Sequence, residues 1–390
     1  MRAPSNPFAS LEPALRALAE SMDVLPATGQ AQEYLQQFDI DEVYDRIRMA
    51  DERLVSRVME RPNNDLYVPL TPLPREQDHV FRFFLDGAVR TFFLGTLVLQ
   101  ENSTPLVLAQ VGAAVVRREH DGTMARHDFG PDLRTQMIFL LDGSVVPQGT
   151  WDALTEHLAE AAGPLRLSAV DISKNDEYND SPQLTTKEPR SRARHRANWS
   201  MRELERAVLR KLLDTTPEDE GWVVIDGGLG KEFRVGTYRT GFLGVVKNFS
   251  KDPVFQIGSG PRRRHLNTFQ LLAELPVNHR TLAFSADGGR AVFWYVRIRE
   301  QGALDYPLMG VIKVELPNPH EDVQESALIN RLSAALLAER TVTPHGLDAR
   351  WHAHLYPISV AERVIREGFY SEEVLRAGIK WPKLQQAVTQ

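Results

Sequence analysis

Two aspartates follow long apolar runs, and glycine follows each of them. Asp86 closes VFRFFLDG and Asp226 closes WVVIDGG. The run before Asp226 has the length and β-branched content of a strand without alternation, which predicts a central strand buried on both faces. A carboxylate beside such a core is costly unless a charged group compensates it, and a divalent cation is one such group. The pattern therefore indicates a metal site at the strand ends.

The alternative is a simple turn, because Asp-Gly is a common turn signal after a strand. A third copy, Asp142 in MIFLLDGS, shows how readily the pattern occurs. Other residues are needed to decide which of the three aspartates belong to a metal site.

One such residue is a glutamate on the helix predicted for WSMRELERAVLRKLL. Glu205 shares a helical face with Met201 and Val208, so we expect it to point toward the core. Glu203 instead falls three residues before Arg206, which is typical of a solvated ion pair. The alternative for Glu205 is also an ion pair, at the edge of the helix.

The same spacing recurs near the C-terminus in YPISVAERVIREGF. Pro357 suits the first turn of a helix. Glu362 takes the i+4 position in a stripe with Ile358 and Ile365. Two glutamates on core-facing stripes thus accompany the strand-end aspartates.

Such carboxylates suit a pair of divalent ions about 4 Å apart, of which one activates water and the other stabilises the leaving oxygen of a phosphodiester. Hard oxygen ligands favour Mn²⁺ or Mg²⁺. An aspartate on a first central strand, a glutamate on the following helix and an aspartate on a later strand is the arrangement of ribonuclease-H-like nucleases. We therefore expect an α/β fold in which helices flank a mixed sheet.

The elements that position these residues divide the chain in two. Residues 1–75 predict a helical extension and a linker, with apolar stripes at Leu11, Leu15, Leu18 and Met22 and at Val43, Ile47, Leu54 and Val58. Residues 76–390 predict the nuclease domain. Within it we expect an antiparallel meander formed by the runs VFRFFLDG, RTFFLGTLVLQ and PLVLAQVGAAVVRR. We also expect a helix at TWDALTEHLAEAAG, with strands at MIFLLDG before it and LRLSAVDIS after it. The polar segment from Ser173 to Arg196 predicts a mobile loop.

Two basic clusters are candidates for DNA contact. They contain Arg190, Arg192, Arg194 and Arg196, and Arg262, Arg263 and Arg264. Each could neutralise several phosphates without sequence preference, and the alternative is a solvated charge run. Four aromatic residues could stack on bases or pack in the core: Phe84, Phe92, Trp294 and Tyr295.

Composition excludes several classes. The chain has 390 residues, a net charge of −6 and no cysteine, so disulfides, thiolate zinc sites and cysteine nucleophiles are absent. No run reaches the roughly 20 apolar residues of a membrane span, and no secretory signal is seen, so we expect a cytoplasmic protein without membrane contact. Neither a GxxxxGK[ST] phosphate-binding loop nor a Gly-x-Ser-x-Gly elbow occurs.

Several segments, in order, resemble the NurA nuclease family. FFLDGAVR is similar to its first Asp-Gly motif, RELERAVLRKLL to its glutamate-bearing helix, WVVIDGGL to its second Asp-Gly motif and FLGVVKNFSKD to its Gly-x-x-Lys strand. YPISVAERV is similar to its Tyr-Pro segment. The resemblance covers roughly residues 78 to 375.

The resemblance implies a manganese-dependent 5′ to 3′ DNA exonuclease and single-strand endonuclease with a ribonuclease-H-like fold. It also implies a homodimer that acts with the hexameric HerA ATPase, a translocase, in DNA end resection and double-strand break repair. Asp86, Glu205 and Asp226 match the family's metal-binding carboxylates, Tyr356 its tyrosine and Lys247 its lysine near the phosphate. An ordinary strand-end lysine is the alternative for Lys247.

Two positions depart from the family pattern. Gly-Ala follows Asp86 where the family has Gly-Ser, and Glu362 stands near the position of the family's C-terminal histidine. Either Glu362 replaces that histidine as a metal ligand or the match fails there, with His352 and His354 as nearby substitutes. Two other functions stay open: a catalytically silent scaffold that binds DNA or an ATPase ring, and a guide-binding module of the Argonaute type, for which no second large domain is seen.

Overall fold

In a computed structural model of the chain, the described residues are 6–27, 57–62, 65–74, 79–130, 133–161, 166–174, 188–230, 233, 241–258, 261, 263–342 and 350–382. The α-helices are α1 (Glu12–Ser21), α3 (Gln148–Glu160), α5 (Pro189–Thr215), α7 (Thr268–Ala273), α8 (Ser326–Glu339), α9 (Tyr356–Glu367) and α10 (Glu372–Gly378).

The strands follow the same numbering. They are β1 (Asp23–Pro26), β2 (Glu60–Arg61), β3 (Tyr67–Pro69), β4 (Phe81–Leu99), β5 (Asn102–Arg118), β6 (Met124–His127), β7 (Thr135–Leu141), β8 (Leu167–Asp171), β9 (Trp222–Asp226), β10 (Phe242–Val246), β11 (Val254–Ile257), β12 (Arg264–Asn267), β13 (His279–Thr281), β14 (Phe284–Ala286), β15 (Ala291–Arg297), β16 (Val311–Pro317) and β17 (Gln324–Glu325).

One large mixed sheet organises the described part of the chain. Its order is β3-β13-β15-β16-β10-β9-β4-β5-β7-β8, with β1, β14 and β6 paired beside β4, β15 and β5. β4, β5 and β7 form an antiparallel meander. After α5, β9 lies parallel to β4, and β10 lies parallel to β9. The expected α/β class, a mixed sheet flanked by helices, is confirmed.

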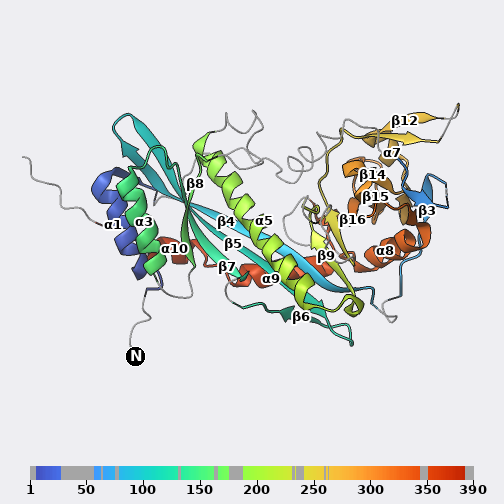
Figure 1. Cartoon of the computed structure of the whole chain (residues 1–390), viewed down its shortest axis with the longest axis horizontal. Coiled ribbons are helices and arrows are strands. Elements are labelled where there is room, and N and C mark those ends of the chain that lie inside the picture. Colours follow the sequence, from blue (N-terminus) through green and yellow to red (C-terminus); the bar gives the residue numbers. More distant parts are fainter. Residues whose placement is uncertain are drawn as a thin grey trace, which may run out of the picture.

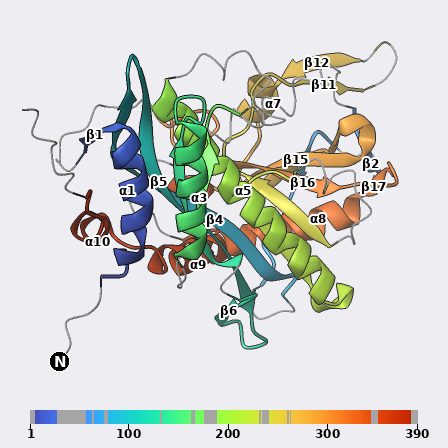
Figure 2. The same ribbon diagram turned by 60° about the vertical axis from the view of Figure 1, so that its left-hand side comes forward.

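Helices cover both faces of the sheet centre (Figures 1 and 2). On one face, α5 packs its Met201 and Val208 against Leu85 and Ile225. On the other face, α8 and α9 pack against the alternate side chains of the same strands, among them Phe84 and Val224. Since successive strand side chains point to opposite faces, both strands are buried on both sides, as their unbroken apolar runs predict.

A separate apolar cluster lies at the far ends of β4 and β5. Leu15 and Leu18 of α1 and Leu154 of α3 pack there with Leu97 and Leu106. The predicted stripe at Leu11, Leu15, Leu18 and Met22 is buried as a whole. Val43, Ile47 and Leu54 of the second predicted stripe lie outside the described residues, and Val58 forms a bridge with Phe284.

The meander differs from its prediction in one respect. The two runs expected as separate strands form the single strand β4 of 19 residues. Asp86 therefore lies inside a strand rather than at its end. Ladder pairing continues through Asp86 and Gly87, opposite Ala114 and Ala113 of β5, and reaches Leu99 after a register shift between Phe93 and Gly95.

The segment 188–196, expected in a loop, is the first part of α5. Glu188 caps the helix by accepting hydrogen bonds from the Arg190 and Ser191 amides, and Pro189 occupies the first turn. Ala193 and Ala197, on the core-facing side of α5, are fully buried. The small residues between the arginines thus allow this stretch to pack on the sheet. Among the described helices, none has both the length and the apolar composition needed to cross a membrane.

Candidate active site

The two selected aspartates lie side by side. β4 and β9 are parallel neighbours with Leu85 opposite Ile225, so Asp86 and Asp226 occupy the next pair of positions. Neighbouring strands are about 4.8 Å apart. Phe84 and Val224, two residues before each aspartate, share one apolar cluster on the α8 and α9 side. Strand alternation directs Asp86 to that side, whereas Asp226, at the end of its strand, also lines the pocket on the α5 side.

Lys247 joins the pair directly after β10. Its Nζ lies 2.8 Å from Asp226 Oδ2, and only 9% of its side chain is exposed. Burial by itself lowers the pKa of the Lys247 ammonium, but the charges of Asp226 and Asp86 outweigh burial, so its net pKa is raised. Lys247 is therefore a fixed cation between two aspartates rather than a solvated lysine at a strand end.

The second aspartate, Asp86, remains poorly compensated. Burial, together with the charges of Asp226, Glu205 and Glu362, raises the pKa of Asp86 well above its usual range, against the opposing charge of Lys247. Asp226 Oδ1 is buried and has no hydrogen-bond partner. An unpaired buried carboxylate oxygen is costly, so the site has room for more positive charge.

Glu205 reaches the site from α5, across the other face of the sheet. It is 7% exposed, as expected for a core-facing glutamate. A side chain at Gly87 would place its Cβ 2.3 Å from Glu205 Oε1, so it would displace the Glu205 carboxylate from this position. Glu205 Oε2 also lies 3.8 Å from Arg202 Nη1. The glycine after Asp86 thus serves the approach of Glu205, whereas Gly227 after Asp226 makes a turn with φ of +92°.

The third Asp-Gly motif has a structural role. Asp142 Oδ2 pairs with Arg192 Nη2 at 2.9 Å, and its Oδ1 accepts a hydrogen bond from the Ser144 amide at 3.0 Å. Both oxygens of Asp142 are therefore satisfied, in contrast to those of Asp226.

The C-terminal candidates are divided between two places. Glu362 forms an ion pair with Arg366 at 2.7 Å and is 35% exposed, yet its charge reaches Asp86. Tyr356 is 53% exposed and lines a separate pocket with Arg118 and Glu339. Of the two histidines, His352 Nδ1 accepts a hydrogen bond from the Gly310 amide at 2.9 Å, which is a turn-stabilising contact.

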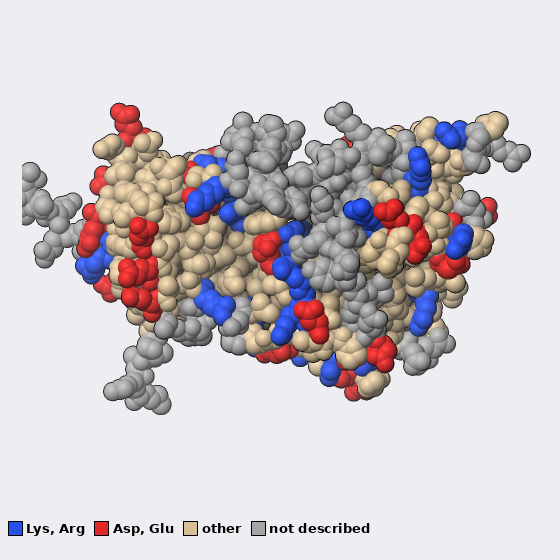
Figure 3. Space-filling view, viewed as in Figure 1, with Lys and Arg blue, Asp and Glu red and all other residues tan. Residues whose placement is uncertain are grey.

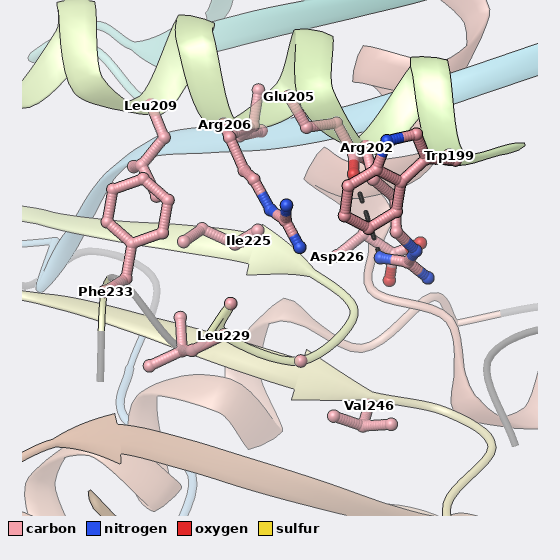
Figure 4. A pocket seen from close by; sticks show the side chains of 13 residues that line it. Trp199, Arg202, Glu205, Arg206, Leu209, Ile225, Asp226, Leu229, Phe233 and Val246 are labelled. Carbon is pink, nitrogen blue, oxygen red and sulfur yellow. Dashed lines mark ion pairs between the residues drawn. The ribbon is translucent and has the colours of Figure 1, made fainter. Parts of the chain in front are cut away.

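A pocket on the α5 face adjoins the carboxylates (Figure 4). Trp199, Arg202, Glu205 and Arg206 of α5 line one wall, and Asp226 lies at the opposite rim. The remaining lining is mostly apolar: Leu85, Leu209, Ile225, Leu229, Phe233 and Val246. Sequence reasoning missed Trp199 and Arg202, although the spacing i, i+3, i+7 of Trp199, Arg202 and Arg206 places them on one helical face.

The basic candidates do not form one patch. On α5, Arg190 and Arg194 share one side and Arg192 and Arg196 another, because residues two apart do not face each other on a helix. The Arg190 guanidinium lies 3.9 Å from the centre of the Phe93 ring. Arg263 and Arg264 are exposed, on or beside the β11–β12 hairpin, which lies apart from α5 in both views (Figures 1 and 2). Arg262 lies outside the described residues.

Charges of both signs mix over α5 on the face shown in Figure 3. The four aromatic candidates are buried, with Phe84, Trp294 and Tyr295 at 0% and Phe92 at 9% exposure. Their assignment to the core is confirmed. The predicted ion pair between Glu203 and Arg206 is also present.

Whether the residues suit a divalent cation depends on donors and charge. Among the described residues, no three His, Asp or Glu side chains converge as a ready ligand set. The donors are nevertheless hard carboxylate oxygens, and Asp226 Oδ1 is buried without a hydrogen-bond partner. Asp86 and Asp226, with Glu205 across Gly87, are the residues that suit a hard divalent ion.

Comparison with known proteins adds no relative. No protein-family model matches this chain, and no curated protein matches it significantly.

Proposed function

We propose that this protein is a Mn²⁺- or Mg²⁺-dependent deoxyribonuclease with a ribonuclease-H-like core, similar to the NurA nucleases. The observation that carries the proposal is the pair Asp86 and Asp226, at adjacent positions on parallel strands, with one buried carboxylate oxygen left unpaired. An antiparallel meander followed by a helix and two parallel strands supports the proposal, since it carries an aspartate, a glutamate and an aspartate in the order found in such nucleases.

The residues have distinct roles in this proposal. Asp86 and Asp226 would hold the metal, with Glu205 or Glu362 completing its ligands. The bound ions would activate water and stabilise the leaving oxygen of a DNA phosphodiester. Lys247, fixed by Asp226 at 2.8 Å, would place its ammonium beside the phosphate, and Arg202 would do the same from α5. Tyr356 has no part in this account because it lines another pocket.

The proposal extends to partners. By its resemblance, the protein would act as a homodimer with a HerA-type hexameric ATPase in DNA end resection. Co-purification of the two proteins and the mass of the complex in light scattering test this part.

The activity is tested with linear single- and double-stranded DNA, labelled at either end, in Mn²⁺, in Mg²⁺ and in EDTA. We expect metal-dependent degradation that Asp226→Asn reduces by more than about a hundredfold, because changes even in the outer shell of a metal site cost 10- to 100-fold. The end label that is released first gives the polarity.

A matched control uses Asp171, another aspartate at the end of a strand. Its carboxylate accepts hydrogen bonds from the Gly143 and Ser173 amides, and an asparagine oxygen can accept the same bonds. Asp171→Asn should therefore keep full activity. Equal activity of Asp226→Asn and wild type, with both folded, would contradict the proposal.

A second candidate function is a silent scaffold that binds DNA or an ATPase ring. One observation favours it: Lys247 already occupies the cation position at Asp226. Wild-type protein that binds DNA but leaves it intact in Mn²⁺, with or without a HerA-type partner, would support this alternative.

A further inference from the structure

The loop that follows Asp226 is held by strands other than its own. Gly227 donates its amide to the Val245 carbonyl at 2.8 Å, and with φ of +92° it turns the chain away from β9. The Leu229 amide then donates to Glu315 Oε2 at 2.9 Å, in a buried hydrogen bond. Glu315 belongs to β16, which is separated from β9 by β10 in the sheet. The turn after a candidate metal ligand is therefore fixed by residues of β10 and β16.

The loop can reach β16 because a glycine of β10 lies beneath it. Gly244 pairs with Glu315 in the ladder between β10 and β16. A Cβ at Gly244 would lie 2.7 Å from the Gly227 carbonyl oxygen and 3.2 Å from the Leu229 nitrogen. These are backbone atoms, so a side chain at this position would push the loop away from β10. Gly244 is also the first residue of the Gly-x-x-Lys run that ends at Lys247, and Figure 4 shows the chain turning back toward β10 after β9.

Glu315 is itself held in place by a neighbour on the same strand. Its Oε1 lies 3.0 Å from Lys313 Nζ, and only 5% and 2% of the two side chains are exposed. The Lys313 ammonium also lies 4.9 Å from the centre of the Phe293 ring. A buried ion pair is weak evidence for stability, because apolar residues of similar volume often serve as well. Here the pair orients a carboxylate whose second oxygen holds the loop after Asp226.

We propose that Glu315 is a positioning residue for Asp226. By holding the Leu229 amide over Gly244, it fixes the backbone that follows Asp226. The Asp226 carboxylate then stays at 2.8 Å from Lys247 Nζ and keeps its direction toward the candidate metal site. Groups that orient metal ligands from behind commonly affect metal affinity 10- to 100-fold.

This inference rests on the proposed metal-dependent function and adds a residue that touches neither the metal nor DNA. It also gives the Gly-x-x-Lys run a physical reason: its glycine admits the loop after Asp226, and its lysine pairs with the Asp226 carboxylate. Both ends of the run thus act on the same aspartate.

The test compares two double variants of the full chain that both lack the buried ion pair. Lys313→Met/Glu315→Gln keeps an amide oxygen that can accept the hydrogen bond from Leu229, whereas Lys313→Met/Glu315→Met has no acceptor there. Mn²⁺ binding is measured by isothermal titration calorimetry, without DNA. We expect the glutamine variant to bind Mn²⁺ as tightly as wild type and the methionine variant to bind it roughly tenfold more weakly. In hydrogen exchange followed by mass spectrometry, the amides of residues 227–230 should exchange faster in the methionine variant alone.

A second variant moves the same loop without touching the ion pair. Gly244→Ala places a Cβ against the Gly227 carbonyl and the Leu229 nitrogen, so it should weaken Mn²⁺ binding and speed exchange at residues 227–230. Gly149→Ala is its control, because a Cβ there meets no atom within 4 Å and should change neither quantity. If the methionine double variant does not fold, Gly244→Ala decides the inference.

Equal Mn²⁺ affinities of the two folded double variants overturn the positioning role and leave the proposed function standing, as does wild-type affinity in folded Gly244→Ala. Absence of Mn²⁺ binding in wild type refutes the proposed function instead. Hydrogen exchange then decides the inference by itself. Faster exchange at residues 227–230 in the methionine double variant, but not in the glutamine variant, supports the hold of Glu315 on the loop, and unchanged exchange overturns it.

Discussion

Two carboxylate groups, Glu60 on β2 of the small two-stranded sheet and Asp226 at the end of β9 in the large sheet, differ in how their oxygens are paired. Glu60, with its side chain fully buried, is paired through both oxygens: Arg280 contacts both, the Ser326 hydroxyl donates to Oε1 at 2.6 Å, and the Ala283 amide donates to Oε2 at 2.9 Å. Asp226 has Lys247 on Oδ2 and no partner on Oδ1.

A related difference is seen between the pKa of Glu60 and that of Asp86, the neighbour of Asp226. Although burial alone would raise the pKa of Glu60, the hydrogen bonds and charge of Arg280, with Ser326 and Ala283, give a lowered net pKa. At Asp86, burial and neighbouring carboxylates raise the pKa. A structural buried acid is fully compensated, whereas an undercompensated acid indicates a place for a ligand.

The largest loss of stability is expected when the fully paired charge of Glu60 is removed. Glu60→Gln leaves the buried Arg280 guanidinium without its carboxylate, so we expect a loss of about 3–5 kcal/mol in the free energy of unfolding, measured by urea denaturation. Glu325→Gln is the control, because the exposed Arg61–Glu325 pair should contribute less than about 1 kcal/mol. Similar losses of stability in both variants would show that the buried Glu60–Arg280 pair contributes no more than an exposed ion pair.

A second test exchanges the cation at the candidate site. Lys247→Met should cost about 1–3 kcal/mol without metal, since Asp226 loses its charged hydrogen-bond partner and the buried Asp86 loses a nearby positive charge. Mn²⁺ should raise the melting temperature of this variant more than that of wild type. In Lys313→Met, which breaks the buried Lys313–Glu315 pair, Mn²⁺ should have no such effect. An equal response of both variants to Mn²⁺ would show that no cation site is present at Asp226.

The third test uses pH. Because the pKa of Glu60 is lowered on folding, its ionisation stabilises the protein above the ordinary glutamate pKa of about 4.3, and this stabilisation is lost as pH falls through the lower folded value. The difference in unfolding free energy between wild type and Glu60→Gln should stay constant from neutral pH down to about pH 5 and shrink below pH 4. A difference that grows on acidification would contradict the lowered pKa.

The smallest effect is expected at Asp86. Because its pKa is raised on folding, the folded state holds its proton more strongly than the unfolded chain, so ionisation at neutral pH costs stability. Asp86→Asn removes this cost and loses an interaction with Lys247, and the melting temperature should stay level or rise slightly while nuclease activity disappears. A loss as large as that of Glu60→Gln would assign Asp86 to the structural class.

The sequence predicted the strands and helices of the sheet centre because their apolar patterns are long and regular. It placed Glu205 and its core-facing neighbours on the right helical face. It did not predict that β4 continues beyond Asp86, because Gly87 has the appearance of a turn. Its role depends on Glu205, which lies more than a hundred residues later in the chain and approaches only in the folded protein.

The candidate site could also be predicted only in part, because its geometry depends on residues that are distant in the sequence. Asp86 and Asp226 are recognisable from local runs, but their adjacent register and the position of Lys247 between them depend on strand order. The structural role of Asp142 depends on Arg192, which the sequence placed in a loop. The pocket with Trp199 depends on the packing of α5 over the glycine loop, which no local pattern specifies.

The length of β4 has a consequence for how the protein opens. Its residues enter the three clusters that contain Phe84, Leu85 and Leu97, so the strand is common to the cores under α8 and α9, under α5 and under α1. Detaching one core without disturbing the others would require breaking the ladder in the middle of this strand. Amide protons around Asp86 should therefore exchange with solvent only when the whole molecule unfolds, as in the most protected segments of cooperative proteins.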